Sequence, residues 1–486
     1  MTDKHKKALQ KANDYIEKYG SKVQETDSRL KIHFMPPVGW MNDPNGVVYH
    51  NNEYHLFFQF YPYDVDWGPM HWGHAKSTDG IRWEYLPVAL APSEEYDFSE
   101  TERGHGCFSG SAISLGNELV LMYTGNVDGR KTKQTQNIAI SSDGINFDKF
   151  QENPVITGFP SEATEDFRDP KIWKHADTYY SIIGTKKEGK GKAAIYSSLD
   201  LKKWDYQGIT TESNDKQGDM WECPDLFNID GQDILVVSPM YGSKNSNPYY
   251  LVGDFNYQNC EFNQHSYEIL DYGNDFYAPQ TLLDGKGRRI MIAWMDIWFA
   301  KMPERADGWA GAMTIARELN FKNGKLYQFP ISELEKYRVQ EKIDENIELQ
   351  KNKYEAKLYD ASDIELIIDI SKTTTEEFDI FLKCSQEMSE YTKVSVDLKN
   401  MQLTVNRELS GEGEKTSSTT PISLDGKQLK LRILIDTNSI ELFVNDGEYT
   451  ITNRVYPKNS DNCFVIQSDS KLFFDKIATW ALETTK

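Results

Sequence analysis

Three carboxylates in this sequence stand in short motifs crowded with aromatic, amide and proline residues. Asp43 lies in the run GWMNDPNG, Asp169 in RDP and Glu222 in WECPD. Asp, Asn, Pro and Gly are ordinary turn residues, so a single motif of this kind is as typical of a turn as of an active site. Three such acids together indicate acid–base chemistry on a polyhydroxylated substrate, because bond cleavage in a sugar needs two differently placed carboxyl groups.

With these three motifs in this order, the chain resembles glycoside hydrolase family 32, the β-fructosidases. The resemblance implies that Asp43 is the nucleophile, Asp169 a transition-state stabiliser and Glu222 the acid/base. It also implies an all-β fold, a five-bladed β-propeller followed by a C-terminal β-sandwich. The expected activity is that of a retaining β-fructofuranosidase, which hydrolyses the terminal fructosyl bond of sucrose, sucrose-6-phosphate or short fructo-oligosaccharides.

Two other functions use the same motifs. A fructosyltransferase differs in whether water or a sugar takes the fructosyl group from Asp43, and sequence spacing does not decide that. A non-catalytic fructan-binding protein would be expected to have lost one of the acids, and all three are present.

The resemblance also implies a set of sugar-binding residues around the acids. Amide and hydroxyl groups would bond sugar hydroxyls, and aromatic rings would pack on the C–H faces of the sugar. A structural role is as common for any one of them, and Arg168 could serve only as a partner of Asp169. The matching residues are Trp40, Asn42, Gln59, Trp67, Phe108, Ser109, Arg168 and, as alternatives to each other, Trp294 and Trp298.

Opposite protonation states are expected of Asp43 and Glu222. The amides of Asn42 and Asn45 could hold Asp43 ionised, with a low pKa. Glu222 must keep a proton, and its apolar neighbours in WECPD together with nearby anionic acids would raise its pKa. Retention further predicts that the two carboxyl groups lie roughly 5–5.5 Å apart.

Composition narrows the class of protein. The chain has 486 residues, enough for two or three domains, and a formal net charge of -21. That acidity disfavours nucleic acid and anionic membrane surfaces, which are bound through clusters of lysine and arginine. No apolar run reaches the roughly 18 residues of a membrane span, and the polar N-terminus lacks the apolar core of a signal peptide. We therefore expect a cytoplasmic protein whose partner is a small sugar, with the oligomeric state left open.

Neither a metal nor a cofactor is expected. The five cysteines lack metal-ligand spacing, and their odd number argues against a disulfide framework. His71 and His74 have no third ligand at a suitable spacing, so a packed, hydrogen-bonded pair is the more common arrangement. The run KEGKGK at 187–192 is typical of a charged hairpin tip rather than of a nucleotide-binding loop.

The hydrophobic pattern divides the chain into four segments. Residues 1–31 form an N-terminal extension with helical spacing over Lys4–Tyr19. Residues 32–328 alternate short aromatic and β-branched runs with Gly, Asn and Asp turns, which predicts the propeller. Residues 329–343, briefly helical and charged, predict a linker. Residues 344–486 contain amphipathic strands typical of a β-sandwich.

A turn motif recurs within the second segment. Ser77–Trp83 (STDGIRW) is repeated as Ser141–Phe147 (SSDGINF) and more loosely as Ser197–Trp204 (SSLDLKKW), at offsets of 64 and 56 residues. A strand, an Asp-centred turn and an aromatic residue with this period are typical of propeller blades. About 290 residues at about 60 per blade predict five blades.

A phosphorylated substrate would need cationic groups near the site. The sequence offers two candidates, Lys244 in the loop 242–247 and Arg103 with His105 just before Phe108. The pattern around both places them in solvated loops, where a charged side chain that binds no ligand is the more common case.

Overall fold

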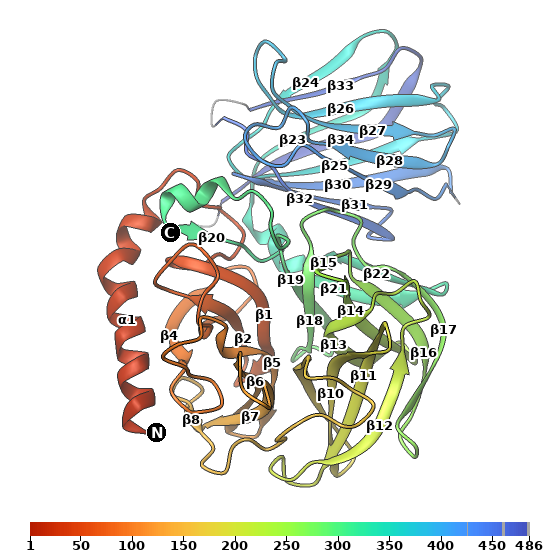
Figure 1. Cartoon of the computed structure of the whole chain (residues 1–486). Coiled ribbons are helices and arrows are strands. Elements are labelled where there is room, and N and C mark those ends of the chain that lie inside the picture. The colour runs from red at the N-terminus through yellow and green to blue at the C-terminus, as the bar shows by residue number, and fades with distance from the viewer. Residues whose placement is uncertain (425, 459–461, 484–486) are drawn as a thin grey trace.

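The protein is described by a computed structural model that covers residues 1–424, 426–458 and 462–483. Strands dominate it. Its one long helix, α1 (Asp3–Gln24), lies along the outer side of the N-terminal part of the molecule (Figure 1). Two short 3₁₀ helices, η1 (Pro303–Asp307) and η2 (Ser332–Tyr337), occur later in the chain.

Between residues 39 and 330 the strands form five antiparallel sheets, apart from one short parallel pair at the edge of the first. Within each sheet the strands follow one another in this spatial order: in the first sheet β20 (Trp309–Ala310), β1 (Gly39–His50), β2 (Glu53–Tyr61), β3 (His71–Ser77) and β4 (Glu84–Leu90); in the second β5 (His105–Leu115), β6 (Glu118–Val127), β7 (Gln134–Ser141) and β8 (Asp148–Lys149); in the third β9 (Phe167–His175), β10 (Thr178–Lys187), β11 (Lys190–Ser198) and β12 (Asp205–Glu212); in the fourth β13 (Met220–Ile229), β14 (Gln232–Tyr241), β16 (Tyr249–Asn256) and β17 (Glu261–Ile269), with β15 (Lys244–Asn245) paired to β14; and in the fifth β18 (Tyr277–Leu283), β19 (Arg289–Trp294), β21 (Arg317–Lys322) and β22 (Lys325–Pro330).

The five sheets are arranged around a common axis. One long strand of each sheet lies nearest this axis. These five innermost strands are β1, β5, β9, β13 and β18. They contact one another in that order, and β18 contacts β1. The recurring turn joins the third and fourth strands in three successive sheets. In each turn the aspartate accepts two backbone N–H groups, as Asp79, Asp143 and Asp200 do. The repeat in the sequence is therefore a repeat in the structure.

Each of these five strands has, at or near its start, a four-residue run at which its pairing is irregular. The runs are Asn42–Asn45, Phe108–Ser111, Arg168–Lys171, Glu222–Asp225 and Tyr277–Gln280, and a register shift lies within or beside each of them. Such a β-bulge adds one residue to the strand and breaks the alternation of side chains. Two consecutive side chains can therefore face the same side, which a regular strand forbids.

The backbone of these bulges is unusual. The second residue has a left-handed conformation in three of the runs, with φ values of 65° at Asp169, 47° at Cys223 and 50° at Ala278. A proline follows each of these residues, and proline brings no N–H group that the interrupted ladder would leave unpaired. The sequence pattern X-X-Pro-polar is therefore a bulge signature in this chain.

The C-terminal part is a sandwich of two six-stranded sheets, stacked on one end of the N-terminal part (Figure 1). Aliphatic side chains from the two sheets fill the space between them. The sheets are β23 (Arg338–Leu349), β34 (Leu472–Leu482), β25 (Ser362–Asp369), β30 (Gln428–Asp436), β31 (Ser439–Val444) and β32 (Tyr449–Arg454); and β24 (Lys353–Lys357), β33 (Cys463–Gln467), β26 (Glu377–Cys384), β27 (Thr392–Asp397), β28 (Gln402–Asn406) and β29 (Ser417–Pro421).

Two boundaries fall elsewhere than the pattern suggests. The N-terminal helix continues to Gln24, five residues beyond the predicted Tyr19, and buries Ala12 and Val23. The strand β23 begins at Arg338, inside the segment predicted as a linker. Most of its side chains are exposed because it lies at the edge of its sheet, so its polar sequence resembles that of a linker.

The segment after α1 joins the two parts through a buried charge cluster. Asp436 accepts hydrogen bonds from the backbone of Lys31 and Ile32 at 2.8 and 2.9 Å. The imidazole of His33 lies between Asp436 (2.8 Å) and Glu441 (2.7 Å). Burial alone would lower the pKa of His33, but the two carboxylates outweigh it and raise this pKa to about 9. His33 is therefore an imidazolium at neutral pH.

We predict that His33→Gln lowers the free energy of unfolding by about 3 kcal/mol at pH 7, because it leaves the buried Asp436 without a cation and Glu441 with Arg317 alone. A pKa raised from 6.5 to about 9 gives stability that is complete below pH 6.5 and is lost as the pH rises through 9. The difference in melting temperature between wild type and variant should therefore shrink from pH 7 to pH 10. The exposed His265 provides the control, His265→Gln, and a gap that does not change with pH would contradict the assignment.

Candidate active site

The motif acids meet in one cavity of about 230 Å³ at the starts of the innermost strands. The first two residues of three bulged runs line it together, as the broken alternation allows. The lining residues are Asn42, Asp43, Gln59, Trp67, Phe108, Ser109, Asp128, Lys133, Gln134, Asp166, Arg168, Asp169, Glu222 and Trp298.

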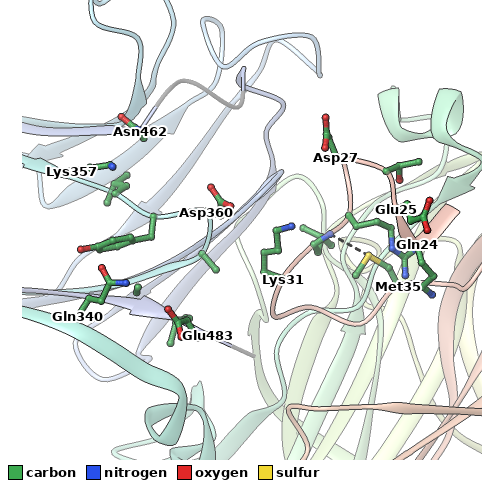
Figure 2. Close-up of a pocket in the computed structure, with 18 residues that line it drawn as sticks. Gln24, Glu25, Asp27, Lys31, Met35, Gln340, Lys357, Asp360, Asn462 and Glu483 are labelled. Carbon is green, nitrogen blue, oxygen red and sulfur yellow. Dashed lines mark hydrogen bonds between the residues drawn. The ribbon is translucent and has the colours of Figure 1, made fainter. Parts of the chain in front are cut away.

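A larger cleft of about 820 Å³ lies elsewhere, between the segment after α1 and the sandwich. Figure 2 shows Asp27 and Lys31 on one side of this cleft and Lys357 and Asp360 on the other. It contains none of the motif residues and no group of converging acids. The catalytic acids predicted from the sequence therefore make the smaller cavity the candidate active site.

Asp43 is held by two side-chain donors. Ser109 Oγ donates to Oδ2 at 2.6 Å and Asn42 Nδ2 to Oδ1 at 3.1 Å. Burial nevertheless raises the pKa of Asp43, the bond from Ser109 opposes that rise and the charge of Glu222 adds to it. The expectation of a low pKa is therefore wrong, since two hydrogen bonds do not compensate for desolvation beside another acid. Asn45 takes no part, because its amide bonds to Gln59 instead.

Asp169 lies beside the thiol of Cys223. Its Oδ2 accepts the backbone N–H of Cys223 at 3.1 Å, and the Cys223 sulfur lies 3.6 Å from both this oxygen and Asp43 Oδ2. The two aspartates therefore flank one sulfur atom. Burial raises the pKa of Asp169 to about 7, with further contributions from Glu222 and Asp43, although Arg168 lowers it. The sequence did not predict this neutral-pH titration.

Glu222 is surrounded by polar donors. Arg168 donates to Oε1 from Nε at 3.0 Å and from Nη2 at 2.8 Å. Tyr277 Oη and Asn245 Nδ2 donate to Oε2 at 2.7 and 3.2 Å. The apolar setting expected for this residue is absent because Trp221 points away, with its indole N–H bonded to the Gln217 carbonyl. Strand alternation turns Trp221 out of the cavity.

The predicted aromatic residues divide into two groups. Trp67, Phe108 and Trp298 line the cavity, whereas Trp40 and Trp294 lie behind it. Trp294 is fully buried against Trp298, with ring centroids 5.2 Å apart. Trp40 stacks on Trp298 at 5.8 Å and donates its indole N–H to Asn42. Of the two alternatives, Trp298 faces the cavity.

Several lining or contacting residues were missed by sequence reasoning. Tyr277 starts the fifth bulged run, so the repeat X-X-Pro-polar could have found it. Asn245 comes from β15, outside any repeat, and no local signal marks it. The other missed residues that line the cavity are Asp128, Lys133, Gln134 and Asp166.

The two cations predicted for a phosphate do not line the cavity. Lys244 is exposed, while its neighbour Asn245 is the residue that reaches Glu222. Successive side chains of a strand point in opposite directions, which explains the difference. Arg103 donates to the backbone carbonyl of Trp67 at 2.8 Å and stays at the surface.

In the described part of the chain, no group of three or more His, Cys, Asp or Glu residues could hold a metal ion. All five cysteines are free thiols. No helix within the described ranges is long and apolar enough to cross a membrane.

The chain belongs to glycosyl hydrolases family 32. The model of the family's N-terminal domain matches residues 33–330, and that of its C-terminal domain matches residues 333–481. The fold of this family is a β-propeller followed by a β-sandwich, in agreement with the all-β structure.

Two sucrose-6-phosphate hydrolases are similar in sequence. That of Zymomonas mobilis is 36% identical, over 98% of this chain and 96% of its own. That of Escherichia coli is 37% identical, over 88% and 89% of the two chains. Among solved structures, the β-fructofuranosidase of Bombyx mori is 34% identical with a TM-score of 0.84, covering 98% of both chains. The sucrose-6-phosphate hydrolase of Lactobacillus gasseri is 26% identical with a TM-score of 0.85, covering 97% and 96%.

The raised pKa of Asp169 gives a prediction about stability. A carboxyl whose pKa is raised from 3.8 to about 7 stabilises the fold fully below pH 3.8, and this contribution is lost as the pH rises through 7. Asp169→Asn should therefore melt higher than wild type at pH 8, by on the order of a few degrees, and the difference should vanish near pH 4. Thermal melts across this range test it, with the exposed Asp205→Asn as control. Parallel profiles for Asp169→Asn and wild type would contradict the raised pKa.

Proposed function

We propose that this protein is a retaining β-fructofuranosidase that hydrolyses sucrose or its 6-phosphate. The observation that carries the proposal is the meeting of Asp43, Asp169 and Glu222 in one cavity, with Arg168 joined to Glu222. Supporting it, relatives similar over nearly the whole chain are sucrose-6-phosphate hydrolases, and a variant of the similar Bombyx mori enzyme forms a complex with sucrose.

In the proposed first step, Glu222 gives its proton to the oxygen between glucose and fructose. The bond from this oxygen to the fructosyl anomeric carbon breaks, and a carboxylate oxygen of Asp43 forms a bond to the same carbon. Glucose leaves with the proton. Ser109 and Asn42 orient the Asp43 carboxylate for this attack through their hydrogen bonds.

In the second step, Glu222, now ionised, takes a proton from water while the water oxygen attacks the anomeric carbon. The ester to Asp43 breaks and fructose leaves with its original configuration. Arg168, Tyr277 and Asn245 orient the Glu222 carboxyl group, because all three donate to it. Asp169 holds fructose hydroxyls, and bonds that tighten as the ring flattens favour the transition state.

The closed floor of the cavity supports action on a terminal sugar. The fourth residues of the bulged runs form the next layer along the axis, and Lys171 links two of them, Asp225 at 2.9 Å and Gln280 at 3.1 Å. These side chains are buried. Such a layer would admit a terminal fructosyl group and would stop a chain from passing through. Trp67, Phe108 and Trp298 would pack on its C–H faces, while Gln59 lies within reach of its hydroxyls.

We further propose that the five sheets are the blades of one five-bladed propeller. The closed series of contacts among the five innermost strands supports this count. The propeller would span residues 32–328 and the sandwich the C-terminal part, joined near η2. A cytoplasmic location remains part of the proposal, since phosphorylated sugar is an intracellular form of substrate. Fructosyl transfer by the same site is the alternative, and the ratio of free fructose to transfer product decides between them.

Asp43→Asn tests the nucleophile. The amide keeps the shape of the side chain and its hydrogen bond to Asn42 or Ser109 in part, but it cannot form the fructosyl ester. We expect kcat on sucrose to fall by about 10⁴-fold or more, the scale of a lost nucleophile. Steady-state kinetics measure this, and a variant that keeps a tenth of the wild-type rate would remove Asp43 from the role.

Glu222→Gln tests the acid. Hydrolysis of sucrose should fall by roughly 10²–10⁴-fold, the usual contribution of general acid catalysis. Formation of the fructosyl-enzyme from a fructoside with an activated leaving group should fall much less, because that group needs no proton. Single-turnover kinetics compare the two substrates. Equal losses in this step would argue against the acid role.

Retention is tested by the first anomer released. A double displacement at the fructosyl carbon predicts β-fructofuranose as the initial product. Time-resolved NMR records it before mutarotation. Initial release of the α-anomer would require direct attack by water and would overturn the two-step mechanism.

A further inference from the structure

One wall of the cavity carries positive charge. The aromatic wall of Trp67, Phe108 and Trp298 has none, whereas Lys133 and Arg168 are the lysine and the arginine among the described residues that line the cavity. Lys133 ends the loop between β6 and β7, whose sequence from Asp128 is DGRKTK. Three cations in four residues contrast with the net charge of -21 for the whole chain.

Arg168 and Lys133 differ in how firmly they are held. Arg168 is engaged by Glu222 at 2.8 Å and by Asp166 at 3.3 Å. Lys133 Nζ lies 3.6 Å from Asp128 and 3.7 Å from Asp166, too far for a hydrogen bond. Its side chain is 28% exposed. Its ammonium can therefore donate to a ligand without breaking a hydrogen bond.

The position of Lys133 relative to Glu222 follows from a chain of ion pairs. Asp166 joins Lys133 to Arg168, and Arg168 joins Asp166 to Glu222. Glu222 is the proposed proton donor to the oxygen on glucose C1. In the glucose ring C1 and C5 flank the ring oxygen, and C5 bears C6. A phosphate on C6 would therefore lie no more than the width of one sugar ring from the oxygen that Glu222 protonates. The ion pairs that lead from Glu222 through Arg168 and Asp166 to Lys133 span a similar distance.

We propose that Lys133, the lysine that lines the cavity, binds a phosphate on C6 of the leaving glucose. This inference rests on the proposed β-fructofuranosidase function and assigns the residue that would distinguish the phosphorylated substrate from sucrose. Charge-assisted bonds from an ammonium to phosphate oxygens are among the stronger hydrogen bonds. Lys133 and Arg168 together offset the repulsion of a dianion by Asp128, Asp166 and the catalytic acids.

The test compares kcat/KM for sucrose-6-phosphate and for sucrose. Wild type should prefer the phosphorylated substrate, and the preference should fall as salt is added, because the loop is exposed. Lys133→Ala should lower the ratio of the two constants by roughly tenfold or more, the scale of one charge-assisted contact. Lys133→Arg should keep most of it. Lys244→Ala is the matched control, since Lys244 is an exposed lysine of another sheet that does not line the cavity, and its ratio should equal that of wild type.

A binding readout makes the test independent of turnover. Glucose 6-phosphate should inhibit sucrose hydrolysis more strongly than glucose, and Lys133→Ala should weaken the first inhibition alone. Equal losses on both substrates would assign Lys133 to positioning Asp166 and Arg168, and an unchanged ratio would place the phosphate elsewhere. Either result overturns the inference. A wild-type enzyme that hydrolyses both substrates without preference overturns it while leaving the proposed function intact, whereas turnover of neither substrate overturns the proposed function itself.

Discussion

The repulsion among three closely placed carboxylates, two of them buried and the third half-buried, is the constraint on which the active site depends. Burial and the charges of neighbouring acids raise the pKa of both Asp43 and Asp169. Arg168 opposes this effect at Asp169, and hydrogen bonds from Ser109 and Asn42 oppose it at Asp43. The guanidinium is itself held by Glu222 and Asp166. Such a cluster is costly in an apolar interior. It persists because each acid is attached to a different strand of a ring, so separating one acid would require opening the ring.

The bulges in the five innermost strands shape the active site. In a regular strand only alternate residues would face the axis. The extra residue in each run lets Asn42 with Asp43, and Arg168 with Asp169, face the same cavity. The left-handed backbone at Asp169 and Cys223 also brings the Cys223 N–H to the Asp169 carboxylate. The strained backbone of the bulges therefore brings together groups that a regular sheet would keep apart.

The sandwich also contributes to the site, although none of its residues lines the cavity. The segment that carries Trp298 is tied to it at both ends. Arg454 of β32 pairs with Glu304 at 2.9 Å and with Asp296 at 3.5 Å. The backbone N–H of Lys301 donates to Glu414 at 2.9 Å. These contacts fix the aromatic wall against the sandwich, which gives the second domain a role in shaping the mouth of the cavity.

The sequence by itself determined the acids, the family and the order of the domains. Each motif is contiguous, and a bulge with its proline is a local structure, so residue type and spacing suffice to mark it. Only the tertiary structure decided that Trp298 rather than Trp294 lines the cavity, that Tyr277 and Asn245 hold Glu222, and that Asp169 is the acid whose pKa rises to about 7. Those properties depend on distances between segments far apart in the chain and on how much water their packing excludes, and a one-dimensional pattern contains neither.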